Sequence, residues 1–196
     1  MTAAATKYRD ALDRILANPD LAPKGQATDD QSDDATVCNI GLQLVAEEYG
    51  YLNFHKLLAN QIMALIEAEA RKHAAWLEWV AGVDKGRPKP ERGDWCECDG
   101  KSAAFSASIG VLTVAACYGE PIKKAGKVIG RGHGHVAAVY PSHQAMLYSV
   151  KWDKDVPVVA SIGKRNGTMG ANYAFKKEPR YFIFTKGLEE KRGETS

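Results

Sequence analysis

The chain has 196 residues, enough for one domain with a sizeable core but short for two. A hydrophobic fraction of 45% and a charged fraction of 26% are ordinary for a globular protein. The formal net charge of +2 is too small to predict nucleic-acid binding, and no run of about 18 apolar residues predicts a membrane span. The four cysteines lie at positions 38, 96, 98 and 117, a spacing unlike that of a secreted disulfide framework.

The N-terminal part of the chain has the period of amphipathic helices. Apolar side chains three and four residues apart predict a first helix that ends before Pro19. Residues 23–34 are polar and acidic, so we expect an exposed loop there. A second helix is expected to follow, with Asp34 or Thr36 as its N-cap and Gly50 just beyond its end.

Three further helical segments are predicted in the middle of the chain. Residues 54–71 have the pattern of a long helix, and residues 76–80 continue a shorter one. Glycine and proline break the periodicity after that, which predicts an exposed loop over about residues 84–100. The alanine-rich residues 102–118 predict a buried helix that Gly119 closes.

Beyond Gly119 the pattern changes to short runs of β-branched and aromatic residues. These runs predict strands over residues 127–129, 136–140, 146–152, 156–162 and 181–185. Helices followed by strands predict an α+β fold, in which the N-terminal helices pack on one face of a C-terminal antiparallel sheet. We expect residues 1–196 to form a single domain with its core over about residues 34–185 and a frayed tail at residues 188–196.

Cys38 and His135 carry the clearest chemical signal. Cys38 stands in the first turn of the predicted second helix, where unpaired amides and the helix dipole favour a thiolate. Gly132 and Gly134 precede His135 at the mouth of a strand and allow the close approach that a general base needs. A cysteine on a helix and a histidine on a later strand form a nucleophile and base. His133 precedes the strand and is expected to be a loop residue without a catalytic role.

Each of these signals has a simpler interpretation. Cys38 could be a small buried hydrophobic residue, and His135 could bond a backbone carbonyl at a strand end. Cys96 and Cys98, together with His133 and His135, could be the ligands of a zinc site. One residue separates the members of each pair, whereas the ligand pairs of structural zinc sites are spaced more widely. We therefore expect no metal and no cofactor. The basic residues 121–131 are most simply a solvated surface; if functional, they would hold substrate carboxylates or phosphates.

Several stretches resemble the papain-like cell-wall amidases and peptidases. This superfamily includes the cysteine, histidine-dependent amidohydrolase/peptidase domains of phage endolysins and the amidase effectors of type VI secretion. The stretches that carry the resemblance are Cys38-Asn39 at the start of a helix, residues 59–63, residues 134–141, residues 156–167, and Ala174-Phe175. The similarity spans about residues 34–185, within which residues 76–98 stand out as an insertion.

The resemblance implies a papain-like hydrolase with Cys38 as nucleophile and His135 as base. It also implies a third polar residue that orients the imidazole. Ser161 is the first candidate, because a strand over residues 156–162 is expected to pair beside residues 136–140 and bring Ser161 level with His135. Asn172 and Asn166 are the alternatives. The Asn39 side chain is expected to help the first-turn amides stabilise an oxyanion.

The function that the resemblance implies is hydrolysis of an amide bond of peptidoglycan, by a phage lysin or a secreted antibacterial effector. Its partners would be peptidoglycan or its stem peptides and a cognate immunity protein. Residues 2–7 run into charged positions and do not form a signal peptide, so we expect synthesis in the cytoplasm and action at the cell wall or periplasm after delivery or lysis. A thiol acyltransferase or transglutaminase-like enzyme with the same dyad, and a non-catalytic binding domain, are the alternatives.

Overall fold

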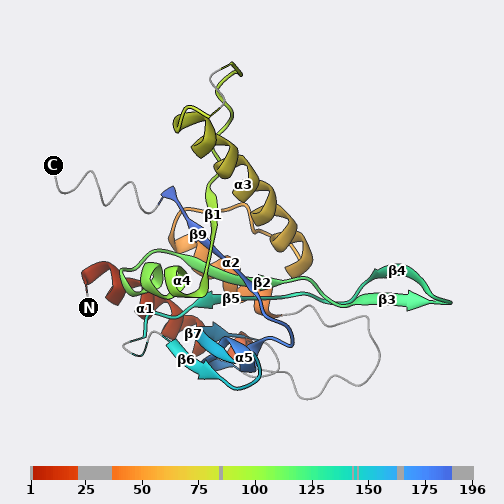
Figure 1. The fold of residues 1–196 in the computed structure, drawn as a ribbon. Helices are drawn as coiled ribbons and strands as arrows, with labels where there is room; N and C mark the ends of the chain where they lie inside the picture. The colour runs from red at the N-terminus through yellow and green to blue at the C-terminus, as the bar shows by residue number, and fades with distance from the viewer. Residues whose placement is uncertain are drawn as a thin grey trace.

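A curled antiparallel sheet forms the centre of the molecule in the computed structural model (Figure 1). The residues that the structure describes are 2–21, 37–83, 86–142, 144, 146–162 and 166–186. The sheet has seven strands in the order β1-β9-β2-β5-β7-β6, and β8 also pairs with β7. Its strands are β1 (Trp95–Cys98), β2 (Thr113–Cys117), β5 (His135–Val139), β6 (Met146–Ser149), β7 (Lys154–Ser161), β8 (Gly167–Gly170) and β9 (Arg180–Phe184).

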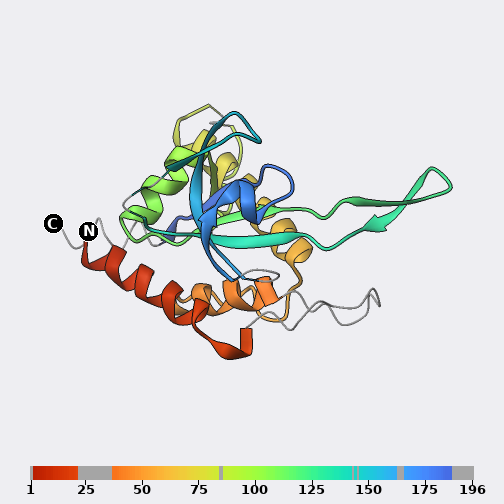
Figure 2. The ribbon, with the colours of Figure 1, turned by 90° about the horizontal axis from the view of Figure 1, so that it is seen from below.

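Helices cover both faces of this sheet rather than the one face that we expected. Figure 2 shows α1 and α2 below the sheet and α4 and α5 above it. The helical elements are α1 (Ala3–Leu16), the 3₁₀ turn η1 (Pro19–Leu21), α2 (Val37–Glu48), α3 (Ala59–Val80), α4 (Gly100–Ser108) and α5 (Ala171–Ala174). The mixed α+β class is confirmed. Within the described ranges, no helix has both the length and the apolar character needed to cross a membrane.

The first two helices form where the sequence predicted them. Thr2 caps α1 by accepting a hydrogen bond from the Ala5 amide at 3.1 Å, and the apolar stripe of this helix is buried. Gly50 follows α2 with a φ of +72°, a conformation that glycine adopts easily. The proposed caps of α2, Asp34 and Thr36, and the acidic loop lie outside the described residues.

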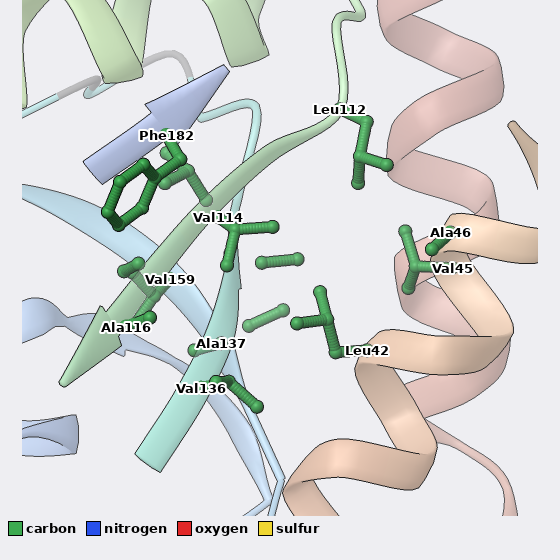
Figure 3. Close-up of a cluster of buried hydrophobic side chains, with 14 of the residues drawn as sticks. Leu42, Val45, Ala46, Leu112, Val114, Ala116, Val136, Ala137, Val159 and Phe182 are labelled. Atoms are coloured by element: carbon green, nitrogen blue, oxygen red, sulfur yellow. The ribbon is translucent and has the colours of Figure 1, made fainter. Parts of the chain in front are cut away.

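The core lies between α2 and the middle strands of the sheet. In Figure 3, Leu42 and Val45 of α2 face Val114 of β2 and Val136 of β5. All four side chains are buried, with exposed fractions of 2% or less. Burial of these branched apolar side chains fixes α2 against the strand that begins at His135.

The predicted helix over residues 102–118 is wrong in its second half. Helix α4 ends at Ser108, Gly110 follows with a φ of +84°, and the chain then enters β2. A Cβ at Gly110 would also overlap the Ala4 backbone, so this close turn requires glycine. Strand β2 is buried on both faces, and its continuous apolar run cannot be told from a buried helix by periodicity.

Two other predictions between α2 and α4 are corrected. The two helices expected over residues 54–71 and 76–80 are the single helix α3, because no helix breaker stands between them. The loop expected over residues 84–100, part of the presumed insertion, ends in strand β1. Trp95 on β1 is fully buried and stacks on Phe54 with ring centroids 5.6 Å apart. An aromatic cluster therefore holds β1 onto the sheet.

The predicted strands after Gly119 are all present, as β4 to β7 and β9, with ends shifted by a few residues. Strands β3, β8 and helix α5 were not predicted. Strand β3 (Pro121–Lys124) pairs with β4 (Lys127–Arg131) in a separate two-stranded sheet. This hairpin, residues 121–131, extends away from the rest of the molecule in Figures 1 and 2, and we call it the arm. The tail at residues 188–196 lies outside the described residues.

Candidate functional site

The candidate site lies where strand β5 begins. His135 is the first residue of β5, which is an inner strand between β2 and β7. On the β2 side, Cys117 is the direct cross-strand partner of His135. On the β7 side, Ala138 pairs with Ala160, which confirms the predicted pairing of these two strands.

Ser161 contacts the imidazole of His135. Extending the pairing of β5 with β7 by one residue places Ser161 opposite Ala137, two residues from His135 and on the same face of the sheet. The two side chains meet along this diagonal, with His135 Nε2 and Ser161 Oγ 3.2 Å apart and hydrogen-bonded. Ser161 is 5% exposed, so water competes little for this bond.

A phenyl ring also contacts the same imidazole. Phe175 lies just after α5, is 2% exposed, and approaches the His135 ring edge-on with centroids 4.8 Å apart. Burial lowers the pKa of His135 to about 4. The imidazole is therefore neutral at neutral pH, as a general base must be. Phe175 belongs to one of the stretches that carry the resemblance, but nothing in the sequence near it indicates a contact with His135.

Cys38 is the second residue of α2, which confirms that it stands in the first turn of a helix. Its side chain is buried and lines a small cavity together with Val136 and Ala138 of β5. A Cβ at Gly41 would overlap the side chain of Ile162, just after β7, so glycine lets α2 lie close to that residue. The structure thus packs the helix that carries Cys38 onto the strand that His135 begins.

Cys117 is a second thiol beside His135 that was not predicted from the sequence. Burial raises the pKa of Cys117, a hydrogen bond with the His135 backbone lowers it, and Cys38 is among the groups that raise it further. Cys117 was missed because residues 102–118 were predicted to be one helix. A predicted strand ending at Cys117 would have placed this thiol at the same end of the sheet as His135.

Asn39 has a structural contact at the start of α2. Its Nδ2 donates a hydrogen bond to the Leu57 carbonyl at 2.7 Å, which ties α2 to the segment before α3. This bond uses one of the two N–H groups of the amide. Cys38 and Asn39 are the second and third residues of α2, so their backbone amides lie in its first turn.

The other candidates lie elsewhere. Asn166 Nδ2 donates to the Leu21 carbonyl at 2.6 Å. Asn172 Oδ1 is buried beside Gly170 and accepts no hydrogen bond from the described part of the chain. His133 is exposed and lies before β5, as predicted. Of the three proposed third residues, Ser161 is the one whose hydrogen bond to His135 is seen.

Asn60, in the first turn of α3, holds the chain segments on both sides of the arm. Its Nδ2 donates to the Gly132 carbonyl at 2.8 Å, and its Oδ1 accepts from the Gly119 amide at 3.0 Å. A Cβ at Gly134 would overlap Asn60 Oδ1, and one at Gly119 would overlap the Gly132 carbonyl. Asn60 therefore fixes the path by which the chain enters β5. Asn60 lies in residues 59–63, one of the stretches that carry the resemblance, but the sequence predicts no contact for it.

Cys96 and Cys98 lie on the edge strand β1, which β9 and β2 separate from β5. Burial raises the pKa of both thiols, that of Cys98 to about 12. In the described part of the chain, no three His, Cys, Asp or Glu side chains gather as metal ligands would. Between the two cysteines, Glu97 forms a two-pronged ion pair with Arg180, at 2.6 Å to each of two guanidinium nitrogens.

The comparisons with known proteins leave the family open. The chain matches no protein-family model and none of the curated proteins.

Proposed function

We propose that the chain is a papain-like cysteine hydrolase that cleaves an amide bond of peptidoglycan. The observation that carries the proposal is the hydrogen bond between His135 and Ser161, on a strand against which the Cys38 helix packs. A nucleophile at a helix start, a base on a strand and a polar group on the far imidazole nitrogen form a triad. Peptidoglycan is proposed as the substrate because the motifs around Cys38 and His135 resemble those of cell-wall amidases and peptidases.

In the proposed reaction, His135 Nδ1 takes the proton of the Cys38 thiol. The Cys38 sulfur forms a bond with the amide carbon, and first-turn amides of α2 stabilise the oxyanion. As the carbon–nitrogen bond breaks, the imidazolium returns its proton to the leaving amine, which leaves a thioester. His135 then takes a proton from water, and the hydroxide attacks the thioester. As the carbon–sulfur bond breaks, the imidazolium returns that proton to the sulfur, which restores the Cys38 thiol and the neutral imidazole. Ser161, bonded to Nε2, holds the ring in the orientation needed for each transfer.

The proposed place of action is the cell wall or periplasm, reached by delivery or lysis. A cognate immunity protein in the producing cell is part of the proposal for a secreted effector. A phage lysin would need no such partner, so protection of the host by a neighbouring gene product separates the two versions.

The test is digestion of purified sacculi followed by mass spectrometry of the released fragments. The protein is expected to release fragments with new amine and carboxyl termini, which identify the cleaved bond. Cys38→Ala is expected to release none, whereas Cys117→Ser, which alters the neighbouring thiol, is expected to retain activity. Release by Cys38→Ala at the full rate would contradict the proposal.

A second candidate, a thiol acyltransferase, is favoured by the shielded imidazole. Phe175 and the surrounding strands partly bury His135, and a transferase must keep water from its thioester. Addition of a small primary amine to the sacculus digestion distinguishes the two reactions. A hydrolase releases free carboxyl termini at an unchanged rate, whereas a transferase releases the amine adduct in their place. A non-catalytic domain would release nothing, and its Cys38 would show no selective alkylation near neutral pH.

A further inference from the structure

The arm gathers positive charge. Lys123, Lys124, Lys127 and Arg131 lie in residues 121–131, and this segment has no acidic residue. Its four positive charges exceed the formal net charge of +2 of the whole chain, so the remainder is slightly acidic. Lys124 is the direct cross-strand partner of Lys127, and like charges in that position destabilise a strand pair. An anionic partner would relieve this repulsion.

The arm also exposes aliphatic side chains. Ile122 is 47% exposed, Val128 is 61% exposed and Ile129 is 62% exposed, and every residue of β3 and β4 is exposed. Val128 lies directly opposite Lys123, so a basic and an aliphatic side chain stand side by side on the hairpin. Long lysine side chains can keep their ammonium groups in a polar layer while neighbouring aliphatic groups enter an apolar one.

The base of the arm is firmly attached. The Gly132 amide donates to the Glu120 carbonyl at 2.7 Å, and Asn60 bonds the backbone on both sides of the arm. Arg131 lies over the Tyr118 ring, 5.1 Å from its centroid. The arm therefore extends from a fixed base beyond the rest of the molecule, where a large flat partner can reach it (Figures 1 and 2).

We propose that the arm is a docking element for the surface of an anionic phospholipid bilayer. Phospholipid headgroups attract the basic residues, and the interface accepts Ile122, Val128 and Ile129. A soluble polyanion or a wall polymer would account for the charges but not for the exposed aliphatic groups. This surface binding is separate from the proposed hydrolysis, since the arm contributes no residue to the candidate site.

The test is cosedimentation of the full chain with vesicles of phosphatidylcholine alone or mixed with phosphatidylglycerol. We expect binding to the mixed vesicles only. Reversal of Lys123, Lys124 and Lys127 to Glu should lower the partition coefficient about 100-fold. A matched control reverses three exposed lysines outside the arm, Lys7, Lys89 and Lys101, and should lower it less than about 10-fold. Equal losses in the two triple variants would overturn the proposal.

A second variant separates a lipid surface from a polyanion. Ile122→Ser with Ile129→Ser keeps every charge and should still lower binding to the mixed vesicles about 10-fold. Binding to heparin should be unchanged in the same variant. Vesicle binding that is equally unchanged would show a general polyanion site and overturn the lipid proposal. Unaltered thermal unfolding of the variants checks the fold, and sacculus digestion, measured in parallel, reports on the proposed hydrolysis independently.

Discussion

His135 Nε2 and Ser161 Oγ are hydrogen-bonded at 3.2 Å across two neighbouring strands, between residues that lie diagonally on one face of the sheet. Because β5 and β7 are inner strands, this geometry is set by backbone pairing on both sides of each strand. The bond occupies Nε2 and leaves Nδ1 as the nitrogen that we assign to proton transfer. Loss of the Ser161 hydroxyl should therefore alter ring orientation without changing the fold.

Ser161→Ala is expected to lower kcat for sacculus hydrolysis about 10-fold, equivalent to about 1.4 kcal/mol in the barrier. The reason is that the imidazole loses the group that fixes its orientation and tautomer. Ser149→Ala is the matched control, because Ser149 is also a buried strand serine and its hydroxyl bonds the Trp152 amide. Ser149→Ala should lower the free energy of unfolding about as much as Ser161→Ala does, and it should leave kcat unchanged. An unchanged kcat and pH profile in Ser161→Ala would remove Ser161 from the triad and bring Asn166 and Asn172 forward.

Cys38→Ala and His135→Ala are each expected to abolish turnover, and the double variant should be scarcely worse than either. The nucleophile and its base act as one unit, so their losses do not add. Initial rates of fragment release from sacculi measure the effect. Two conservative controls sit close to the site: Cys117→Ser changes the thiol opposite His135, and His133→Ala removes the exposed histidine before β5. Full activity of His135→Ala together with an inactive His133→Ala would exchange the roles of the two histidines.

Asn60→Asp should lower kcat about 10-fold and leave KM unchanged. The aspartate can still accept from the Gly119 amide, but it cannot donate to the Gly132 carbonyl, so the entry to β5 is less well fixed. Gln61→Glu is the control, since the Gln61 side chain accepts from the Leu58 amide and a carboxylate can do the same. The rate of Cys38 alkylation as a function of pH gives a readout that needs no substrate. If that rate and kcat both match the wild type, Asn60 has a structural role only.

The local patterns of the sequence predicted the parts of the fold that are amphipathic. Helices α1 and α2 bury one face, and the pairing of β5 with β7 followed from adjacent apolar runs, which is why Ser161 could be placed near His135. Strand β2 was missed because both of its faces are buried, and Cys117 was missed with it. The contacts of Asn60 and Phe175 join segments far apart in the chain, and such contacts leave no periodic signal.

The partly buried imidazole should also make folding stability depend on pH. The pKa of His135 is about 4 in the folded chain and near the ordinary 6.5 when unfolded. Between these values the unfolded chain binds a proton that the folded chain does not. The stabilising effect is therefore fully present above pH 6.5 and is lost as the pH falls toward 4, by up to about 3 kcal/mol.

Urea unfolding of the wild type and of His135→Gln at pH 4, 5, 6 and 7 measures this effect. Glutamine can keep a hydrogen bond with Ser161 but does not titrate, so subtraction of the two curves removes the contribution of the carboxylates that both proteins share. We expect the stability advantage of the wild type over His135→Gln to shrink as the pH falls through this window. His133→Gln removes an exposed histidine instead and should follow the wild type throughout. A stability difference between the wild type and His135→Gln that stays constant from pH 7 to 4 would show that His135 is not held neutral by burial.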